Sequence, residues 1–348
     1  MRFVKAVFLL LVLAAVAIGT YAYHAVQLSR EPYKGYPGSE VFFSVPRGAS
    51  GTRVGSKLED EGIIRDRRIF VAALRLRGET DRIQAGEYRF SGPVSMLEVI
   101  DRLIAGDVYT FPVTIPEGLT LKETAENLAA QNLGESGVFL ELFDEASSIS
   151  DLDPDAWNLE GYLFPTTYHF TRGVEPSEIA RTLVAQFREV LDRKRRDRAA
   201  ELGMTIRQVV TLASIVEKET GSAPERPIIA SVFWNRLNRG MALASDPTLI
   251  YALKLEGRFD GNLRRSDLEM DSPYNSYRRT GLPPSPIASP GHASIDAVLE
   301  PAKSDYLYFV SKNDGTHHFS RTYREHQAAV REYQIDYFRR RRNGGGGS

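Results

Sequence analysis

The sequence predicts an α+β protein whose folded part follows one N-terminal transmembrane helix. Three observations lead to this class. Residues 6–28 contain no charged side chain, which is typical of a membrane span. After them, short strand patterns are mixed with amphipathic helix patterns that begin at capping residues. From residue 151 onward, loops rich in aromatic residues and proline interrupt the helices. A chain of 348 residues with 42% hydrophobic side chains can bury one large core or two smaller ones.

The uncharged segment 6–28 is the first predicted element. At about 1.5 Å per residue, a helix of this length crosses the roughly 30 Å hydrocarbon core of a bilayer. Arg2 and Lys5 precede it, so the positive-inside tendency keeps residues 1–5 in the cytoplasm. The alternative is a cleaved signal peptide, because Ala15-Val16-Ala17 resembles a cleavage site. The uncharged stretch continues past that site, which favours a single-pass anchor in the inner (cytoplasmic) membrane, with the folded part on the periplasmic, extracytoplasmic side.

A tether and a small α/β subdomain are expected next. Residues 29–40 are rich in proline, glycine and tyrosine and lack apolar periodicity, which is typical of a tether. Residues 41–135 contain a faint repeat, because Val45-Pro46-Arg47-Gly48 and Ile115-Pro116-Glu117-Gly118 each follow a strand pattern and precede a helix pattern. Such units resemble the LysM-like modules, which bind N-acetylglucosamine polymers. The alternative is an ordinary α+β domain that uses proline and glycine for its turns.

The largest predicted part is a mixed α+β domain over residues 136–338. Within it, the helical spacing of Ile179, Leu183 and Phe187 predicts a helix over 176–198. Residues 159–170 are expected to form a loop and a strand, since glycine and proline interrupt them. Residues 339–348 are a basic tail followed by glycines and a serine that look like an engineered linker, so they are left out of the functional argument.

Composition excludes several classes of ligand. The 44 basic and 45 acidic side chains give a net charge of −1, so no positive field is available to hold nucleic acid. The chain has no cysteine, and its six histidines show no metal-binding spacing. It also contains neither a G-x-G-x-x-G motif nor a P-loop. The sequence therefore predicts no metal and no nucleotide cofactor.

The segment 205–220 is the first candidate for chemistry. Thr205 and Gln208 form a capping box, and the helix that follows is apolar on nearly every side, which predicts burial. It ends in Glu217-Lys218-Glu219. A carboxyl group at the end of such a helix is partly desolvated, which favours the protonated form that a general acid needs. Glu217 and Glu219 fall on different apolar stripes, so periodicity alone does not choose between them. The alternative is a solvated helix end whose glutamates pair with Lys218 or Arg226.

Loops that combine tyrosine, asparagine and proline follow this helix. One of them contains Tyr274, Asn275 and Tyr277. Aromatic faces pack against pyranose rings, and amides bond acetamido and hydroxyl groups, so such loops suit a sugar site. Each string taken alone is equally compatible with a structural lid.

The succession of short motifs along the chain is more specific. It runs A-S-I-V-E-K-E-T, S-V-F-x-N-R-L, S-D-P-T, Y-N-S-Y, G-L-P-P-x-P-I-x-x-P-G, P-A-x-x-x-Y-L-Y-F-V and G-x-H-x-F. This order resembles the endolytic murein transglycosylases, the YceG-like family, from the anchor to about Tyr337. Two features depart from the expected pattern: Trp234 stands where a smaller apolar residue is expected, and residues 221–226 form an ordinary-looking loop.

The resemblance implies a function and a set of site residues. It implies a membrane-anchored lytic transglycosylase with a LysM-like subdomain and a catalytic domain, which cuts the bond between N-acetylmuramic acid and N-acetylglucosamine in nascent strands and leaves a 1,6-anhydro end. The implied role is in cell-wall assembly and control of strand length, with peptidoglycan synthases as candidate partners. The position that matches the family's catalytic glutamate is Glu217, expected to be unpaired and to act as both acid and base. The candidate substrate-binding residues are Glu219, Asn235, Asp246, Tyr274, Asn275, Tyr277 and His317.

Two other classes of protein remain open on the sequence. A membrane-anchored muramidase would share the substrate, but it would use a second carboxylate and water, so its products would be one water heavier. A peptidoglycan-binding scaffold without activity would need only the LysM-like half.

Overall fold

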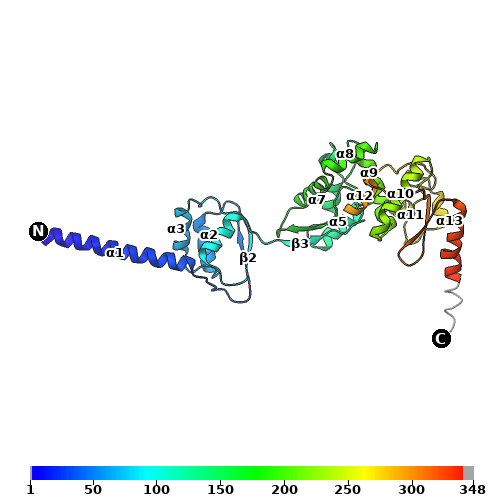
Figure 1. Ribbon diagram of the computed structural model, residues 1–348. Helices are drawn as coiled ribbons and strands as arrows, with labels where there is room; N and C mark the ends of the chain where they lie inside the picture. The colour runs from blue at the N-terminus through cyan, green and yellow to red at the C-terminus, as the bar shows by residue number, and fades with distance from the viewer. Residues whose placement is uncertain (1, 340–348) are drawn as a thin grey trace, which may run out of the picture. The chain divides into compact units, whose positions relative to one another are not determined.

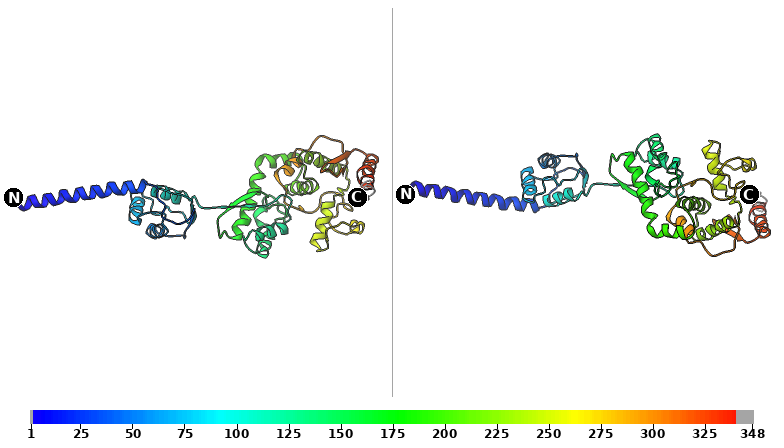
Figure 2. Two further views of the ribbon diagram at one scale, coloured as in Figure 1. Left: turned by 90° about the horizontal axis from the view of Figure 1, so that it is seen from below. Right: turned by 90° about the horizontal axis from the view of Figure 1, so that it is seen from above.

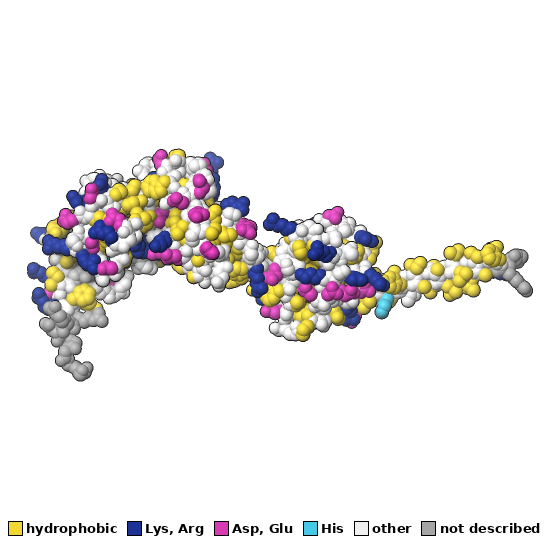
Figure 3. Space-filling view, turned by 180° about the vertical axis from the view of Figure 1, so that it is seen from behind, with side chains coloured by type: hydrophobic (Ala, Val, Ile, Leu, Met, Phe, Trp, Pro, Cys, Tyr) yellow, Lys and Arg dark blue, Asp and Glu magenta, His cyan; other side chains and the backbone are white. Residues whose placement is uncertain are grey.

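The computed structural model describes residues 2–339, and its first element is the 29-residue helix α1 (Arg2–Arg30) (Figure 1). The predicted apolar helix is therefore confirmed, and its apolar window is entirely unburied. Figure 3 shows hydrophobic side chains along most of its length, whereas the folded parts carry mixed charges. Within residues 2–339, α1 is long and apolar enough by itself to cross a membrane. Apart from Arg339, the predicted tail and linker at 339–348 lie outside the described residues, as does Met1.

The folded chain forms two compact units, and the first contains the residues up to Pro112 together with His169–Gly173. Strand alternation places Phe43, Tyr88 and Phe90 in its core, where each is at most 1% exposed. The elements of this unit after α1 are an antiparallel pair of strands, β1 (Val41–Val45) and β2 (Gly86–Phe90), and the helices α2 (Gly51–Asp60), α3 (Arg67–Leu76) and α4 (Met96–Ala105).

The segment predicted as a tether is packed onto this first unit. Ala25 and Leu28, in the last turns of α1, lie against the core of the unit. Tyr36 is 6% exposed, and its hydroxyl donates a 3.0 Å hydrogen bond to the carbonyl of Gly92. A buried aromatic ring whose hydroxyl has a hydrogen-bond partner lowers the free energy of the folded state, and a solvated linker would not gain this stabilisation. Residues 29–40 therefore join α1 to the unit instead of separating them, and both views in Figure 2 show α1 running straight into it.

The two halves of the predicted repeat share a turn geometry but not a unit. Gly48 and Gly118 both adopt the left-handed conformation, with φ of +72° and +76°, which explains glycine at these positions. The first half lies in the first unit. In the second half, α5 (Leu121–Ala130) packs against α6 (Ser136–Phe143), and both belong to the second unit. The units divide at Pro112 and Val113, upstream of the boundary predicted between residues 135 and 136.

The second unit is built around α9 (Ile206–Glu219), in which every residue from Val209 to Val216 is buried. The capping box of Thr205 and Gln208 is present, as predicted. Helices α8, α10, α11 and α12 all pack against α9. The further helices of this unit are α7 (Pro176–Val190), α8 (Arg193–Glu201), α10 (Arg226–Asn238), α11 (Asp246–Leu255), α12 (His292–Leu299) and α13 (Tyr323–Val330), with short helical turns η1 (Ser147–Ile149), η2 (Ala223–Glu225), η3 (Arg265–Glu269) and the π-helical η4 (Arg331–Asp336).

The remaining strands form two further ribbons. Strand β3 (Phe111–Thr114) pairs with β4 (Thr167–Phe170), where the chain passes from the first unit to the second. Strand β4 confirms the loop and strand predicted for residues 159–170. The antiparallel hairpin of β5 (Tyr308–Ser311) and β6 (His317–Ser320) packs against α13.

The helix predicted over 176–198 is two helices. Helix α7 ends at Val190, and the Asp192 side chain accepts a 2.8 Å hydrogen bond from the Arg195 backbone N–H to begin α8. An aspartate at an N-cap satisfies one of the unpaired N–H groups of a new helix, which stabilises a restart of the helix at this point.

Candidate active site

The Glu217 carboxylate lies where the end of α9 meets the beginnings of α10 and α12. Its side chain is 6% exposed. One oxygen accepts a 3.0 Å bond from Arg226, and the other accepts from the Gly291 backbone N–H at 3.0 Å and from the Ser294 hydroxyl at 2.8 Å. The expectation of an unpaired Glu217 is therefore wrong. Arg226 is its partner, as in the alternative weighed above, but the pair is buried and not solvated.

The N-terminus of α12 explains why a carboxylate is stable at this buried position. Gly291 is the N-cap of α12, so its N–H and the Ser294 hydroxyl stand at the positive end of the helix dipole. Hydrogen bonds to a charged acceptor are roughly twice as strong as neutral ones. The same arrangement stabilises the charge that appears on Glu217 whenever it gives up a proton.

A second carboxyl group, Glu117, approaches the same arginine. Its Oε2 atom lies 3.6 Å from the Arg226 nitrogen that Glu217 also contacts, and its side chain is 46% exposed. Burial, followed by the negative charge of Glu217, raises the pKa of Glu117, while Arg226 and His292 oppose this shift. In the sequence, Glu117 stands out only as part of a repeated turn, because no local pattern shows that this turn reaches α9.

Backbone contacts hold the Glu117 turn against the site. The Gly118 N–H donates to the Ser289 carbonyl at 2.9 Å, and the Ser289 N–H donates to the Leu119 carbonyl at 2.8 Å. The Lys218 ammonium donates to the Gly118 carbonyl at 3.0 Å. The turn is thus fixed both to the Pro-rich loop before α12 and to the end of α9.

Glu219 faces a different part of the second unit. Its carboxyl accepts a 2.5 Å hydrogen bond from the Ser245 hydroxyl. Burial raises the pKa of Glu219 to about 7, and the charge of Asp246 acts in the same direction against the Ser245 hydrogen bond and Arg236. A carboxyl group whose pKa is raised by burial, as expected at the end of this helix, is therefore Glu219. The same effect occurs away from α9, since burial raises the pKa of Glu160 to about 8.

Glu219 lines a cavity of about 360 Å³ with aromatic walls. Two other predicted residues, Asp246 and Tyr277, lie in the same cavity, and the Tyr277 hydroxyl donates a short hydrogen bond to Asp246. The Arg236 guanidinium lies over the Tyr308 ring and donates to the Leu307 and Leu243 carbonyls. The lining is Glu219, Arg236, Leu243, Ala244, Asp246, Tyr277, Tyr308, Phe309, Tyr323 and His326.

The other predicted substrate-binding residues hold loops in this structure. Asn275 is fully buried and donates to the Leu268 and Met270 carbonyls. The Tyr274 hydroxyl is 2.6 Å from that of Ser285. Asn235 donates to the Ser304 and Tyr306 carbonyls, and the His317 ring pairs with Glu225 at 2.8 Å. None of these four lines the cavity around Glu219, so their contact with a substrate stays a prediction.

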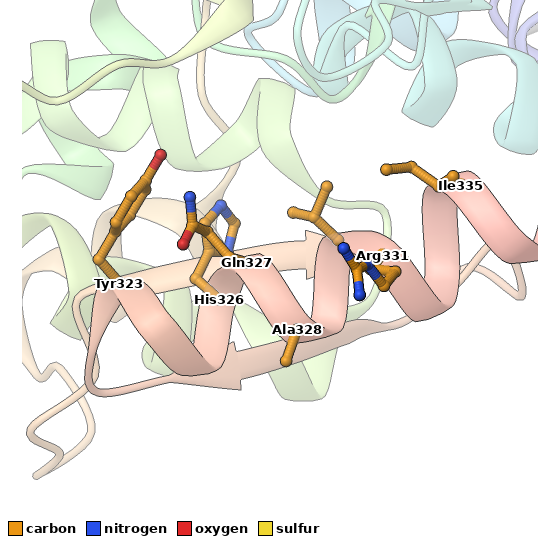
Figure 4. A pocket seen from close by; sticks show the side chains of 7 residues that line it. Tyr323, His326, Gln327, Ala328, Arg331 and Ile335 are labelled. Atoms are coloured by element: carbon orange, nitrogen blue, oxygen red, sulfur yellow. The ribbon is translucent and has the colours of Figure 1, made fainter.

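A more open hollow of about 700 Å³ runs along α13 and η4 (Figure 4). Tyr323 and His326 line both this hollow and the cavity around Glu219. No sequence motif indicates this surface, since its residues follow the last motif of the succession. In the part of the chain that the structure describes, no group of three or more His, Asp or Glu side chains is placed to hold a metal ion.

Comparison with known proteins adds the family context. The sequence model of the YceG-like family matches residues 43–332. A protein of Bacillus subtilis (strain 168) named endolytic murein transglycosylase is 31% identical over 319 residues, which cover 87% of each chain. Another of that name, from Streptococcus pneumoniae serotype 2, is 29% identical, and the alignment covers 90% of this chain and 62% of that protein. The crystal structure of a yceG-like protein from Listeria monocytogenes matches 83% of this chain and 98% of its own, with 32% identity and a TM-score of 0.57.

Proposed function

The chain belongs to the YceG-like family, and from this premise we propose that it cuts the glycan strands of peptidoglycan between N-acetylmuramic acid and N-acetylglucosamine, leaving a 1,6-anhydro end. Its curated relatives are named endolytic murein transglycosylases, so the chain is a lytic transglycosylase, a carbon–oxygen lyase, with peptidoglycan as its substrate. The observation that supports the proposed chemistry is the Glu217 carboxylate, buried at the motif-matched position with three donors around it.

The proposed reaction uses Glu217 first as acid and then as base. Its O–H gives a proton to the glycosidic oxygen, the bond from that oxygen to the anomeric carbon breaks, and the muramic sugar becomes oxocarbenium-like. The Glu217 carboxylate then takes the proton of the C6 hydroxyl, and O6 bonds to the anomeric carbon. Glu217 ends protonated, and no water is consumed. Between the two steps, Arg226, Gly291 and Ser294 stabilise the carboxylate.

The cavity around Glu219 is our proposed contact for the glycan. Tyr277, Tyr308 and Tyr323 give it aromatic walls, while Asp246 and Arg236 supply polar groups. Sugar sites combine flat apolar faces with a few fixed polar groups in this way. Burial raises the pKa of Glu219 to about 7, which favours a protonated carboxyl that can donate to a substrate oxygen.

A two-carboxylate hydrolase is the second candidate, and Glu117 is the observation that favours it. Inverting and retaining hydrolases both need a second carboxylate near the first, and Glu117 shares Arg226 with Glu217. Mass spectrometry of the products from purified glycan strands separates the two reactions. We expect ends one water lighter than reducing ends; reducing ends would show the hydrolase.

We propose that α1 stays in the inner membrane as a single-pass anchor with the rest of the chain on the periplasmic side. Its 29 residues extend about 43 Å, more than the hydrocarbon core requires. The full-length protein is expected to remain in the membrane fraction after an alkaline wash. N-terminal sequencing of that protein checks the anchor, because a chain that begins just after Ala17 would show a cleaved signal peptide.

We also propose that the first unit acts as a LysM-like module that adds glycan affinity and no chemistry. Support comes from the order of strand β1, the left-handed turn at Gly48 and helix α2 within this unit. Removal of residues 41–112 should weaken binding to long strands while cleavage that depends on Glu217 stays detectable. Binding is best measured by sedimentation with insoluble peptidoglycan, in Glu217→Gln backgrounds so that the strands stay intact. Equal binding with and without the unit would make it a spacer.

Peptidoglycan synthases are our proposed protein partners, and this proposal follows the family resemblance alone. We likewise propose, on the same ground, that the cut falls in nascent strands and limits their length during wall assembly.

A further inference from the structure

Arg226 is shared between two carboxyl groups, and the proposed reaction uses only one of them. The same nitrogen lies 3.0 Å from Glu217 and 3.6 Å from Glu117. Arg226 is 11% exposed and Glu217 is 6% exposed, whereas Glu117 is 46% exposed. One buried cation therefore balances two acids, of which one is enclosed and the other reaches solvent.

The position of Glu117 is fixed by the absence of a side chain at residue 291. A Cβ atom on Gly291 would lie 1.9 Å from Glu117 Oε1, so the carboxyl occupies the space that any other residue would fill. The Gly291 N–H meanwhile donates to Glu217. Both carboxyl groups thus contact the N-cap residue of α12 as well as Arg226.

Three other charged or titratable groups act on Glu117 from the elements packed around it. Glu217 comes from α9, Arg226 from the beginning of α10, and His292 from α12. Lys218 is engaged with the Gly118 carbonyl at 3.0 Å. Arg226 is therefore the cation in reach of both carboxylates, and a charge on either acid opposes a charge on the other.

We propose that Glu117 is a positioning residue of the lytic reaction, which acts through Arg226 to keep the proton on Glu217 until the glycosidic oxygen takes it. This inference rests on the proposed function. A negative charge at Glu117 repels a second negative charge at Glu217. It also competes with Glu217 for the Arg226 guanidinium. Without that charge, Arg226 pairs with Glu217 alone, which favours the charged form of Glu217.

The pH dependence of kcat for strand cleavage tests this role. In Glu117→Gln, the pH at which activity falls on the alkaline side should move about one unit toward acid. Activity on that side then drops about tenfold, while activity at lower pH stays close to wild type and KM is unchanged. Glu117→Asp, which keeps the charge, should restore much of the profile. A uniform loss at every pH, or a change confined to KM, would overturn the proposal.

Glu256→Gln is the matched control. Glu256 is a glutamate of the same unit, 47% exposed against 46% for Glu117, and its partner is Arg258 instead of an arginine of the site. Glu256→Gln removes the same charge from an ion pair that does not include Arg226. Its pH profile should equal that of the wild type; a matching shift would mean that net charge, and not the shared arginine, sets the profile.

A measurement that needs no activity separates this inference from the proposed function. Carbon-13 NMR of the Glu117 carboxyl gives its titration in the full-length protein and in Glu217→Gln. Because the charge of Glu217 raises the pKa of Glu117, that pKa should fall in Glu217→Gln, where Arg226 also becomes available. An unchanged titration would refute the coupling even if strands are cut. If the pKa of Glu117 falls in Glu217→Gln but the wild-type protein cuts no strands, the coupling is supported and the proposed function is refuted.

Discussion

Glu217→Gln is expected to lower the rate of strand cleavage by about 10²–10⁴-fold, because general acid catalysis is typically worth that much. Glutamine keeps the shape of the side chain but has no proton to give the glycosidic oxygen. Glu219→Gln should lose much less, since Glu219 is proposed to contact the glycan and not the breaking bond. The rate of release of anhydro ends from purified strands measures both variants.

The structure sharpens the control for this experiment. A carboxylate accepts on both oxygens from Arg226, Gly291 and Ser294, whereas the NH₂ group of glutamine cannot accept from any of them. An unsatisfied buried donor costs about 1–3 kcal/mol, so part of any loss could be a loss of folded protein. Tryptophan fluorescence monitors this, because both tryptophans, Trp157 and Trp234, lie in the second unit.

The rival assignment is Glu219, whose pKa of about 7 suits an acid at neutral pH. If Glu219→Gln removes as much activity as Glu217→Gln while both remain folded, the lone-carboxylate assignment is wrong. If Glu219→Gln alone abolishes cleavage, the acid is at position 219.

Asp153→Ala is expected to destabilise the second unit by about 3–5 kcal/mol, because it removes a buried carboxylate that is the ion-pair partner of Arg207. Asp153 is 4% exposed and pairs with Arg207, which is 18% exposed, at 2.9 Å. The Tyr162 hydroxyl also donates to Asp153 at 2.5 Å. The substitution therefore leaves both Tyr162 and Arg207 without the carboxylate that they share. Arg207 lies over the Trp157 ring, so urea unfolding followed by tryptophan fluorescence reports the change at the site itself.

Asp151→Ala is the contrasting variant for this test. Asp151 also forms a close pair with an arginine, Arg188, at 2.6 Å, but the two side chains are 59% and 39% exposed. Solvent screens such a pair, and it contributes little to stability. Equal losses from the two substitutions would show that burial does not decide the cost of breaking these pairs.

Sequence patterns predicted secondary structure correctly where residues within one or two helical turns determine it. The capping box of Thr205 and Gln208 and the apolar sides of α9 are sequence-local, and the structure confirms both. The same periodicity placed Glu217 and Glu219 on different stripes, and they indeed face α12 and the Ser245 loop respectively. Because both stripes are apolar, this periodicity could not show which of the two glutamates pairs with an arginine.

The rest depended on contacts between distant segments. Glu117 reaches Arg226 over more than a hundred residues of sequence, and no spacing rule encodes that approach. The split near Asp192 was readable in principle, since an aspartate before a charged run is a capping signal. The packing of Tyr36 was not, because proline and glycine around it are equally typical of a solvated linker.

The packing of the last turns of α1 against the first unit couples the orientation of the helix to that of the unit. Ala25 and Leu28 pack against the unit's core, so the end of the helix is held against the unit. A transmembrane helix longer than the local bilayer relieves the excess by tilting. For the anchor proposed above, a thinner bilayer therefore means a larger tilt of α1, and we expect the first unit, which is packed on its last turns, to tilt with it.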